Sequence, residues 1–190
     1  MQTPSLSCRS PPKTLPGVES YKPSLIPADS FHPRSSGIAL RRRRVLRRMK
    51  SFTDSERQEF LAAKHVGVLS VAAADGRPPA SVPMWYDYVP GGDIRVNTGA
   101  GARKAKLIDR AGAVTLVVQR EEPPYQYVVV EGTVVETTAP TPTEVREAIA
   151  VRYLGEEGGR AFVRGMEGQD NVLFTIRPDR WISADFSGDL

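Results

Sequence analysis

The chain has almost none of the residues from which metal sites and nucleophilic active sites are built. It contains one cysteine, Cys8, and two histidines, His32 and His65, in 190 residues. A single cysteine excludes a disulfide framework or a cysteine metal site within one chain. Two histidines leave little for a zinc site or a histidine-based triad, and His65, between an expected helix and strand, is interpreted as structural. The composition argues against metal hydrolases and Cys or His nucleophile enzymes.

The sequence also lacks a long apolar run. No stretch approaches the roughly 20 consecutive apolar residues that a membrane-spanning helix needs. The hydrophobic share is 40%, which is ordinary for a soluble protein, and 190 residues suit one domain with a real core. We therefore expect a cytoplasmic protein with no membrane partner.

Acidic residues are scarce in the first part of the chain. Residues 1–50 hold 11 of the 26 Lys and Arg but 2 of the 22 Asp and Glu, a net charge of +9. Residues 51–190 therefore carry 15 basic and 20 acidic groups, a net charge of −5. The basic pI of the whole chain gives no reason to expect nucleic-acid binding by the folded part.

The N-terminal part has the composition of a disordered extension. Residues 1–48 hold seven of the sixteen prolines and show no apolar periodicity. We predict a disordered, basic Pro/Ser/Arg-rich extension over 1–50 and a folded domain over 51–190. The run Arg41–Arg44 with Arg47 and Arg48 fits a nucleic-acid patch, part of a transit peptide, or sequence upstream of a start at Met49, and the last is favoured because Met49 directly precedes the domain.

Two capping-box patterns predict helices in the folded part. Thr53–Glu56 opens a helix that runs to about Lys64, and Thr141–Glu144 opens another, with proline at its first position, that ends near Leu154. The glycine-rich stretch 155–168 is expected to be loop.

Alternating and β-branched segments predict the strands. Pro83 indicates an edge strand, and Gly132 indicates a bulge. Short strands without regular alternation with helices favour an antiparallel barrel, so the expected fold is mainly β with flanking helices. The seven predicted strands cover 66–71, 80–88, 93–98, 113–118, 125–135, 171–176 and 180–186.

One stretch, 93–119, predicts a strand, a glycine turn, a basic helix and a second strand. Gly112 stands where a helix usually ends. Arg103, Lys104 and Lys106 lie in the first helical turn, where the positive end of the helix dipole disfavours cations. A phosphate bound there would reverse that preference. The alternative is a solvated basic face with no ligand.

The order of these motifs resembles a known family of flavoproteins. Thr98, the glycine turn, the basic segment Arg103–Lys106 and the later strand Val129–Val134 are similar to the pyridoxamine 5′-phosphate oxidase-like split β-barrel superfamily. That superfamily includes the deazaflavin (coenzyme F-420)-dependent oxidoreductases. The resemblance covers about 53–186 and implies an antiparallel, FMN-binding split barrel-like fold that forms a homodimer.

The resemblance also implies where a flavin-type cofactor would bind. Thr98, Arg103 and Lys104 would hold its phosphate, with Lys106 at the edge, in a groove between subunits. The segment before Tyr88 would line the ring. The further implied cofactor contacts are Val82, Trp85, Tyr86, Asn97, Gln119, Tyr127 and Trp181.

Several of these residues have a structural alternative. Either Trp85 or Tyr86 could belong to the barrel core or a dimer interface, and Trp181 could be core. Asn97 and Thr98 could instead cap the end of a strand.

The sequence departs from true pyridoxamine phosphate oxidases. Ser81 and Tyr86 stand where those enzymes have Arg and Lys, Tyr127 replaces a glutamine, and 181–185 lacks their cationic substrate motif. The segment Ser81–Asp87 instead resembles the Pro-x-Trp-[Phe/Tyr] segment of the deazaflavin-dependent branch.

These departures favour F-420, with FMN as the alternative, and hydride transfer to a small conjugated or heterocyclic substrate. A missing acid or base agrees with cofactor-borne chemistry. An FMN-binding oxidase-like protein and a non-catalytic flavin carrier or sensor remain as alternatives.

Overall fold

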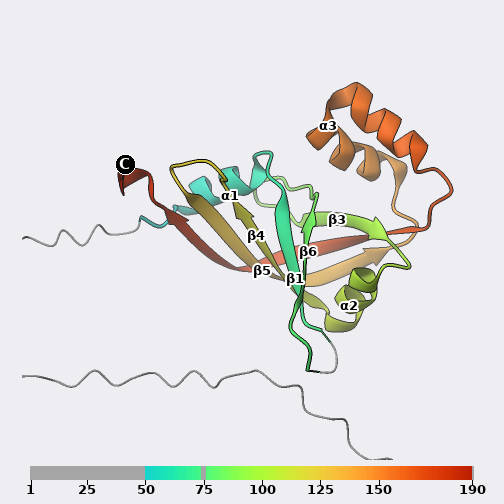
Figure 1. Cartoon of the computed structure of the whole chain (residues 1–190), viewed down its shortest axis with the longest axis horizontal. Helices are drawn as coiled ribbons and strands as arrows, with labels where there is room; N and C mark the ends of the chain where they lie inside the picture. Colours follow the sequence, from blue (N-terminus) through green and yellow to red (C-terminus); the bar gives the residue numbers. More distant parts are fainter. Residues whose placement is uncertain (1–49, 74–75, 190) are drawn as a thin grey trace, which may run out of the picture. The chain divides into compact units, whose positions relative to one another are not determined.

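The computed structural model describes residues 50–73 and 76–189 (Figure 1). The predictions made for residues 1–49 lie outside the described residues. No helix in the described part is long and apolar enough to cross a membrane. The elements in chain order are α1 Asp54–Ala62, β1 Gly67–Val71, β2 Ala80–Met84, β3 Ile94–Gly99, α2 Arg103–Ala111, β4 Ala113–Gln119, β5 Gln126–Thr138, α3 Thr143–Gly165, β6 Asn171–Asp185 and a 3-10 turn, η1 Ser187–Asp189.

The strands form one curled antiparallel sheet of six strands in the order β2-β1-β4-β5-β6-β3. The two edges of this sheet approach one another, because Asp87, just after β2, makes a bridge with Arg95 of β3 at the other end of the strand order. An ion pair between the same two side chains supports the bridge. The sheet is therefore a half-barrel, as predicted.

The prediction of seven strands is wrong in one respect. The two last predicted strands form the single long strand β6, which pairs with β5 and, over its first half, with β3 (Figure 1). Pro178 does not interrupt β6, because it lies opposite Gly132 at a register shift where β6 has one extra residue, Asp179, and a missing backbone N–H is tolerated. A register shift does occur at Gly132, as predicted, but its extra residue lies on β6 and not on β5. A Cβ there would come within 2.6 Å of Ile176 Cγ2.

The second predicted strand is shorter than expected. β2 ends at Met84 rather than Tyr88, since the chain then leaves β1 to cross toward β3. The edge position that Pro83 predicted is confirmed, because among the described strands β2 pairs only with β1.

The core lies on the concave side of the sheet and under α1 and α2. α1 contributes Leu61, and α2 contributes its apolar stripe. Burial of a large apolar side chain stabilises a fold by about 1.5–3 kcal/mol, so these residues hold both helices against the sheet. The largest fully buried side chains are Tyr86, Phe174, Leu61, Leu69, Ile94, Ile108, Leu116 and Ile176.

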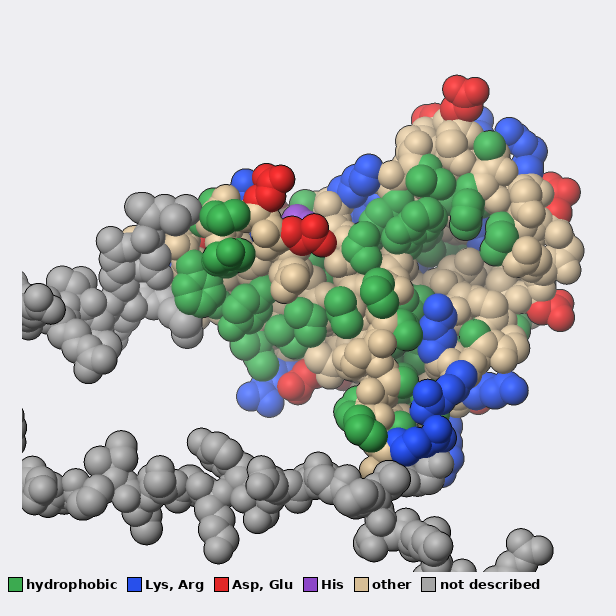
Figure 2. All heavy atoms as spheres, viewed as in Figure 1, with side chains coloured by type: hydrophobic (Ala, Val, Ile, Leu, Met, Phe, Trp, Pro, Cys, Tyr) green, Lys and Arg blue, Asp and Glu red, His purple; other side chains and the backbone are tan. Residues whose placement is uncertain are grey.

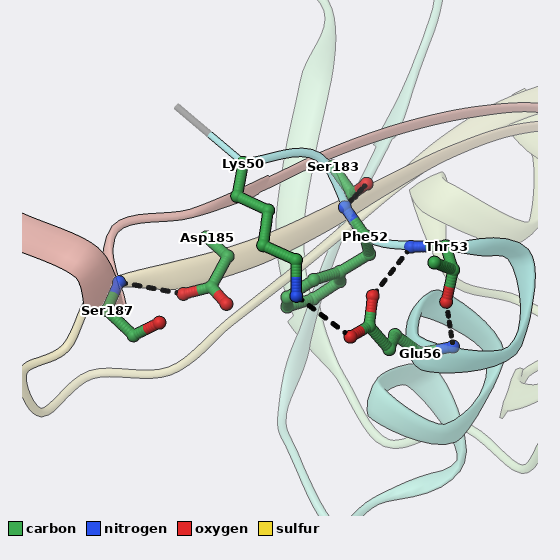
Figure 3. A network of polar contacts seen from close by, with 7 residues as sticks. All are labelled: Lys50, Phe52, Thr53, Glu56, Ser183, Asp185 and Ser187. Carbon is green, nitrogen blue, oxygen red and sulfur yellow. Dashed lines mark hydrogen bonds and ion pairs between the residues drawn. The ribbon is translucent and has the colours of Figure 1, made fainter. Parts of the chain in front are cut away.

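The first capping box is confirmed and ties the start of the domain to its end. Thr53 Oγ1 accepts from Glu56 N–H (3.3 Å), and Glu56 Oε2 accepts from Thr53 N–H (2.8 Å). Lys50 Nζ forms an ion pair with Glu56 (3.1 Å), and Lys50 O accepts from Asp185 N–H (2.8 Å). Figure 3 shows this network, in which the segment before α1 lies beside the end of β6. The hydrogen bonds from Thr53 hold the pKa of the Glu56 carboxyl below its usual value.

The prediction for the second helix is wrong about its cap, and the expected end near Leu154 is confirmed by a break at Gly155. Pro142 is the N-cap of α3, and no side chain caps the helix. Thr141 does not cap the helix, because its N–H donates to Asn171 Oδ1 (3.0 Å) and its hydroxyl donates to Asn97 Oδ1 (2.7 Å). The stretch expected as loop is a second helical segment, joined to the first by a kink at Gly155 (φ 77°, ψ 172°).

The two helical segments of α3 pack together as a hairpin (Figure 1). A Cβ at Gly159 would lie 2.5 Å from the backbone nitrogen of Val151, so the hairpin needs glycine at this position. Arg146 Nη2 also donates to Met166 O (3.3 Å), which joins the start of α3 to its C-cap. In the view of Figure 1, this hairpin lies above β3 and the basic helix α2 lies below it.

Candidate functional site

A cleft of about 490 Å³ lies among β2, β3, the start of α2 and the α3 hairpin. Its size is within the usual range for small-molecule sites, about 300–1,000 Å³. The apolar lining residues are Val66, Pro83, Met84, Trp85, Ile149, Ala150, Phe162, Val163 and Met166, and the others are Asn97, Thr98, Gly99, Lys104, Arg146, Gln169, Asp170 and Asn171.

One end of the cleft offers donors to an anion. Thr98, at the end of β3, and Lys104, in the first turn of α2, both line it. The N-cap of α2, Ala102, has no side chain that caps the helix, so the first N–H groups have no side-chain partner. Lys104 forms no ion pair with any residue in the described ranges. This end can therefore bind a phosphate or a carboxylate.

The other two cations of this helix do not line the cleft. Arg103 and Lys106 are exposed and lie outside its lining. Figure 2 shows basic side chains gathered over α2, beside the hollow beneath α3. The structure thus brings together Thr98 and Lys104 from the predicted phosphate set, and it leaves Arg103 and Lys106 on the outer surface of the helix. Gly112, in the left-handed region (φ 63°), ends α2 as predicted.

An aromatic wall, formed by Trp85 and Phe162, lines part of the cleft. The Trp85 ring stacks on Tyr153 of α3, with centroids 5.0 Å apart and planes at 7°, and it lies 5.4 Å from the Phe162 ring. Tyr153 is held by its hydroxyl, which donates to His65 O (2.7 Å) and accepts from Tyr86 N–H (3.2 Å). Burial raises the pKa of the Tyr153 hydroxyl, which therefore stays neutral. Trp85 is consequently a positioned, half-buried ring at the cleft wall.

Tyr86 lies in the core rather than at the cleft. Its side chain is 0% exposed, and its hydroxyl donates to Leu61 O (2.7 Å). The guanidinium of Arg152 lies 5.0 Å from the centre of its ring. Burial raises the pKa of the Tyr86 hydroxyl. Of the two neighbouring aromatics, Tyr86 takes the core position and Trp85 the half-buried position at the cleft, because successive side chains of an extended segment alternate in direction.

Asn97 lines the cleft and also serves as a tether. Its Oδ1 accepts the hydrogen bond from the Thr141 hydroxyl, which fixes the entry to α3. This structural role differs from the strand-end cap that the sequence left open, because Asn97 lies within β3. Its amide group still borders the cleft.

The four remaining predicted contacts lie away from the cleft lining. Gln119 is exposed and borders a separate hollow of about 300 Å³ with His65 and Arg120. Tyr127 lies near Phe186 (centroids 6.5 Å), and Trp181 packs beside Tyr88 (6.2 Å). Val82 is half-buried opposite Leu69 of β1.

Sequence reasoning missed the part of the cleft that α3 supplies. Phe162 and Val163 lie in the second segment of α3, which was expected as loop, and Met166 is the C-cap of this helix; Arg146 lies in the first segment. A helical spacing from Phe162 to Met166 was present in the sequence, but the neighbouring glycines hid it.

The comparisons with known proteins agree with this architecture. The family profile described as pyridoxamine 5′-phosphate oxidase matches residues 53–184. No curated protein matches the chain.

Among solved structures, the chain is similar to an F420 reductase at 24% identity and a TM-score of 0.54, over 66% of this chain and 94% of that one. It is similar to a conserved hypothetical protein from Mycobacterium tuberculosis at 22% identity and a TM-score of 0.59, over 73% and 89%. It is also similar to a FAD-binding protein from Mesorhizobium loti at 19% identity and a TM-score of 0.50, over 72% and 96%. At these identities the likeness shows the fold, and the predicted split barrel is confirmed.

Proposed function

The chain belongs to the pyridoxamine 5′-phosphate oxidase family, and from that premise we propose that it is an oxidoreductase with a flavin-type cofactor. F-420 is favoured over FMN because the segment Ser81–Asp87 resembles the deazaflavin-dependent branch. The proposed reaction is hydride transfer to a small conjugated or heterocyclic substrate.

The observation that carries the proposal is that an anion-binding end and an aromatic wall meet in one cleft. Lys104 and Thr98 would bind the cofactor phosphate at the start of α2, and their free donors fit such a group. Trp85 would pack against the ring system and exclude water from it. When bound, the cofactor supplies the hydride chemistry, and the protein supplies position and electrostatics.

A homodimer is part of the proposal. Four side chains in register, Val68, Val117, Val129 and Ile182, form an apolar row across neighbouring strands on the side of the sheet away from the core. Val68 is 39% exposed and Ile182 is 42% exposed. Pro83 of β2 is paired with Val68 of β1, and it also lines the cleft. We therefore expect a second copy to cover the row and to border the cofactor site.

A non-catalytic flavin carrier is the second candidate. The cleft lining contains no histidine, cysteine or tyrosine, and Asp170 is its one carboxylate within the described residues. Turnover of reduced cofactor with candidate acceptors separates the enzyme from the carrier. The names of the structural neighbours suggest F-420 and FAD as cofactors to titrate, and FMN is the alternative that the sequence suggests.

The deciding experiment is calorimetric titration of F-420 and FMN into wild type and Lys104→Ala. Charge-assisted hydrogen bonds contribute about 1.5–3 kcal/mol each, so affinity should fall by roughly one to two powers of ten. The fold should be unaffected, since a cation at the positive end of a helix is not stabilising without a ligand.

Lys106→Ala is the matched control, because Lys106 is on the same helix but outside the cleft lining. Its effect should be smaller. Riboflavin, which has no phosphate, should bind wild type and Lys104→Ala equally. Equal affinity of wild type and Lys104→Ala for both phosphate-bearing cofactors would overturn the proposal.

A further inference from the structure

A second cation faces the same cleft from its other side. Arg146 is half-buried near the start of α3 and lines the cleft together with Lys104 of α2. In the view of Figure 1, α3 and α2 lie on opposite sides of β3. Two separate elements therefore present a positive charge to one cavity.

Arg146 has little to neutralise it. Its one hydrogen bond to a described residue is the long contact from Nη2 to Met166 O (3.3 Å). Arg146 forms no ion pair with any of the described residues. By contrast, Arg160 on the same helix pairs with Glu156 at 2.8 Å. Asp170 also lines the cleft, but its carboxylate is not within the 4.0 Å of an ion pair with either cation. A guanidinium has five donors in a planar fork, so most of its donors remain free.

The position of Arg146 suits the recognition of a ligand. The contact with Met166 O anchors one edge of the guanidinium to the C-cap of α3. Arg146 also lines the cavity, in which Gln169 is a further polar lining residue. A half-buried cation without a counter-ion is unfavourable, and an anion in the cleft would remove that cost.

We propose that Arg146 binds a second anionic group, a carboxylate or a phosphate, in addition to the phosphate assigned to Lys104. The inference rests on the proposed function for the identity of the first group. The second group belongs either to the substrate, which is then an acid, or to the cofactor itself. In both cases the occupants of the cleft carry negative charge at two places, toward α2 and toward α3.

The competing explanation is that Arg146 merely fastens the α3 hairpin through Met166 O. Two substitutions separate these roles. Arg146→Gln removes the charge but retains an N–H donor, whereas Arg146→Lys retains the charge. Anion binding requires the charge, and fastening requires the donor. Arg164→Gln is the matched control, because Arg164 is exposed on α3, outside the cleft lining.

The test is a titration of the full-length protein with four ligands: F-420, FMN, and the simple acid probes cinnamate and inorganic phosphate. The two acid probes are titrated both with and without cofactor. Arg146→Gln should weaken at least one of these ligands about tenfold. Arg146→Lys should remain within about threefold of wild type, and Arg164→Gln should match wild type. The melting temperature of Arg146→Gln should be unchanged.

The pattern of losses identifies the source of the second group. Weaker F-420 or FMN binding assigns it to the cofactor, while weaker binding of the acid probes alone assigns it to the substrate. The proposal is overturned if Arg146→Gln equals wild type for all four ligands. It is also overturned if Arg146→Gln and Arg146→Lys lose affinity equally while the melting temperature falls. Failure of the proposed function is a separate result, because Lys104→Ala reports it.

Discussion

Replacing Gly159 by alanine should force the two segments of α3 apart. The added Cβ would lie 2.5 Å from Val151 N, 2.6 Å from Val151 Cα and 2.7 Å from Val151 Cγ2. Two of these atoms are backbone and cannot rotate away, so the segments themselves must separate. The perturbation therefore acts on the packing of the hairpin, and through it on the cleft.

The expected magnitude follows from two opposing effects. Overpacking of this kind costs about 1–3 kcal/mol, and alanine recovers about 0.5–1 kcal/mol relative to glycine within a helix. The net loss in the free energy of unfolding should therefore be about 1–2 kcal/mol, or several degrees in melting temperature for a domain of this size. Ligand affinity should fall as well, because Phe162 and Val163 line the cleft from the displaced segment.

Denaturant unfolding of the two alanine variants Gly159→Ala and Gly165→Ala tests this reasoning. A Cβ at Gly165 would meet nothing within 4 Å, so that variant should be as stable as wild type or slightly more stable. If Gly159→Ala matched Gly165→Ala in the free energy of unfolding, the close packing of the hairpin would be refuted.

Two further predictions concern assembly and pH. Val68→Lys places a charge in the apolar row and should convert the dimer expected at micromolar concentration to a monomer, as measured by light scattering. Val135→Lys is the control, because Val135 is exposed outside the row, and it should leave the dimer intact. A wild-type protein that is monomeric would contradict the proposed dimer. Burial, together with the charges of Arg152 and Arg120, lowers the pKa of His65, so the unfolded chain binds that proton more tightly. The free energy of unfolding should therefore decrease as the pH falls below about 6.5. His65→Gln should flatten this part of the pH–stability profile. A profile identical to that of wild type would contradict the role given to His65.

Features with a local cause were readable from the sequence. The capping box of Thr53 and Glu56 depends on residues three positions apart, and Gly112 ends α2 because glycine adopts a positive φ at little cost. The edge position of β2 follows from Pro83, which lacks the N–H that a central strand needs. The basic first turn of α2 was equally visible, and with it the expectation of an anion site.

The parts that depend on distant partners were decided by the tertiary structure. Thr141 follows the capping pattern, yet it bonds with Asn97 and Asn171, which are brought beside it by β3 and β6. The glycine-rich stretch after Leu154 becomes helical because Gly159 allows its backbone to pack on Val151.

Which cations face the cleft was also a tertiary result. The local pattern does not distinguish the three cations Arg103, Lys104 and Lys106, but of these Lys104 lines the cavity. Arg146 lines the same cavity from a helix that begins 40 residues later in the chain. The basic helix after a glycine turn was predictable from local residues, because helix starts and stops are set by neighbours in the chain. The hairpin of α3 determined where the cavity lies, because a cavity exists only between elements that long-range packing brings together.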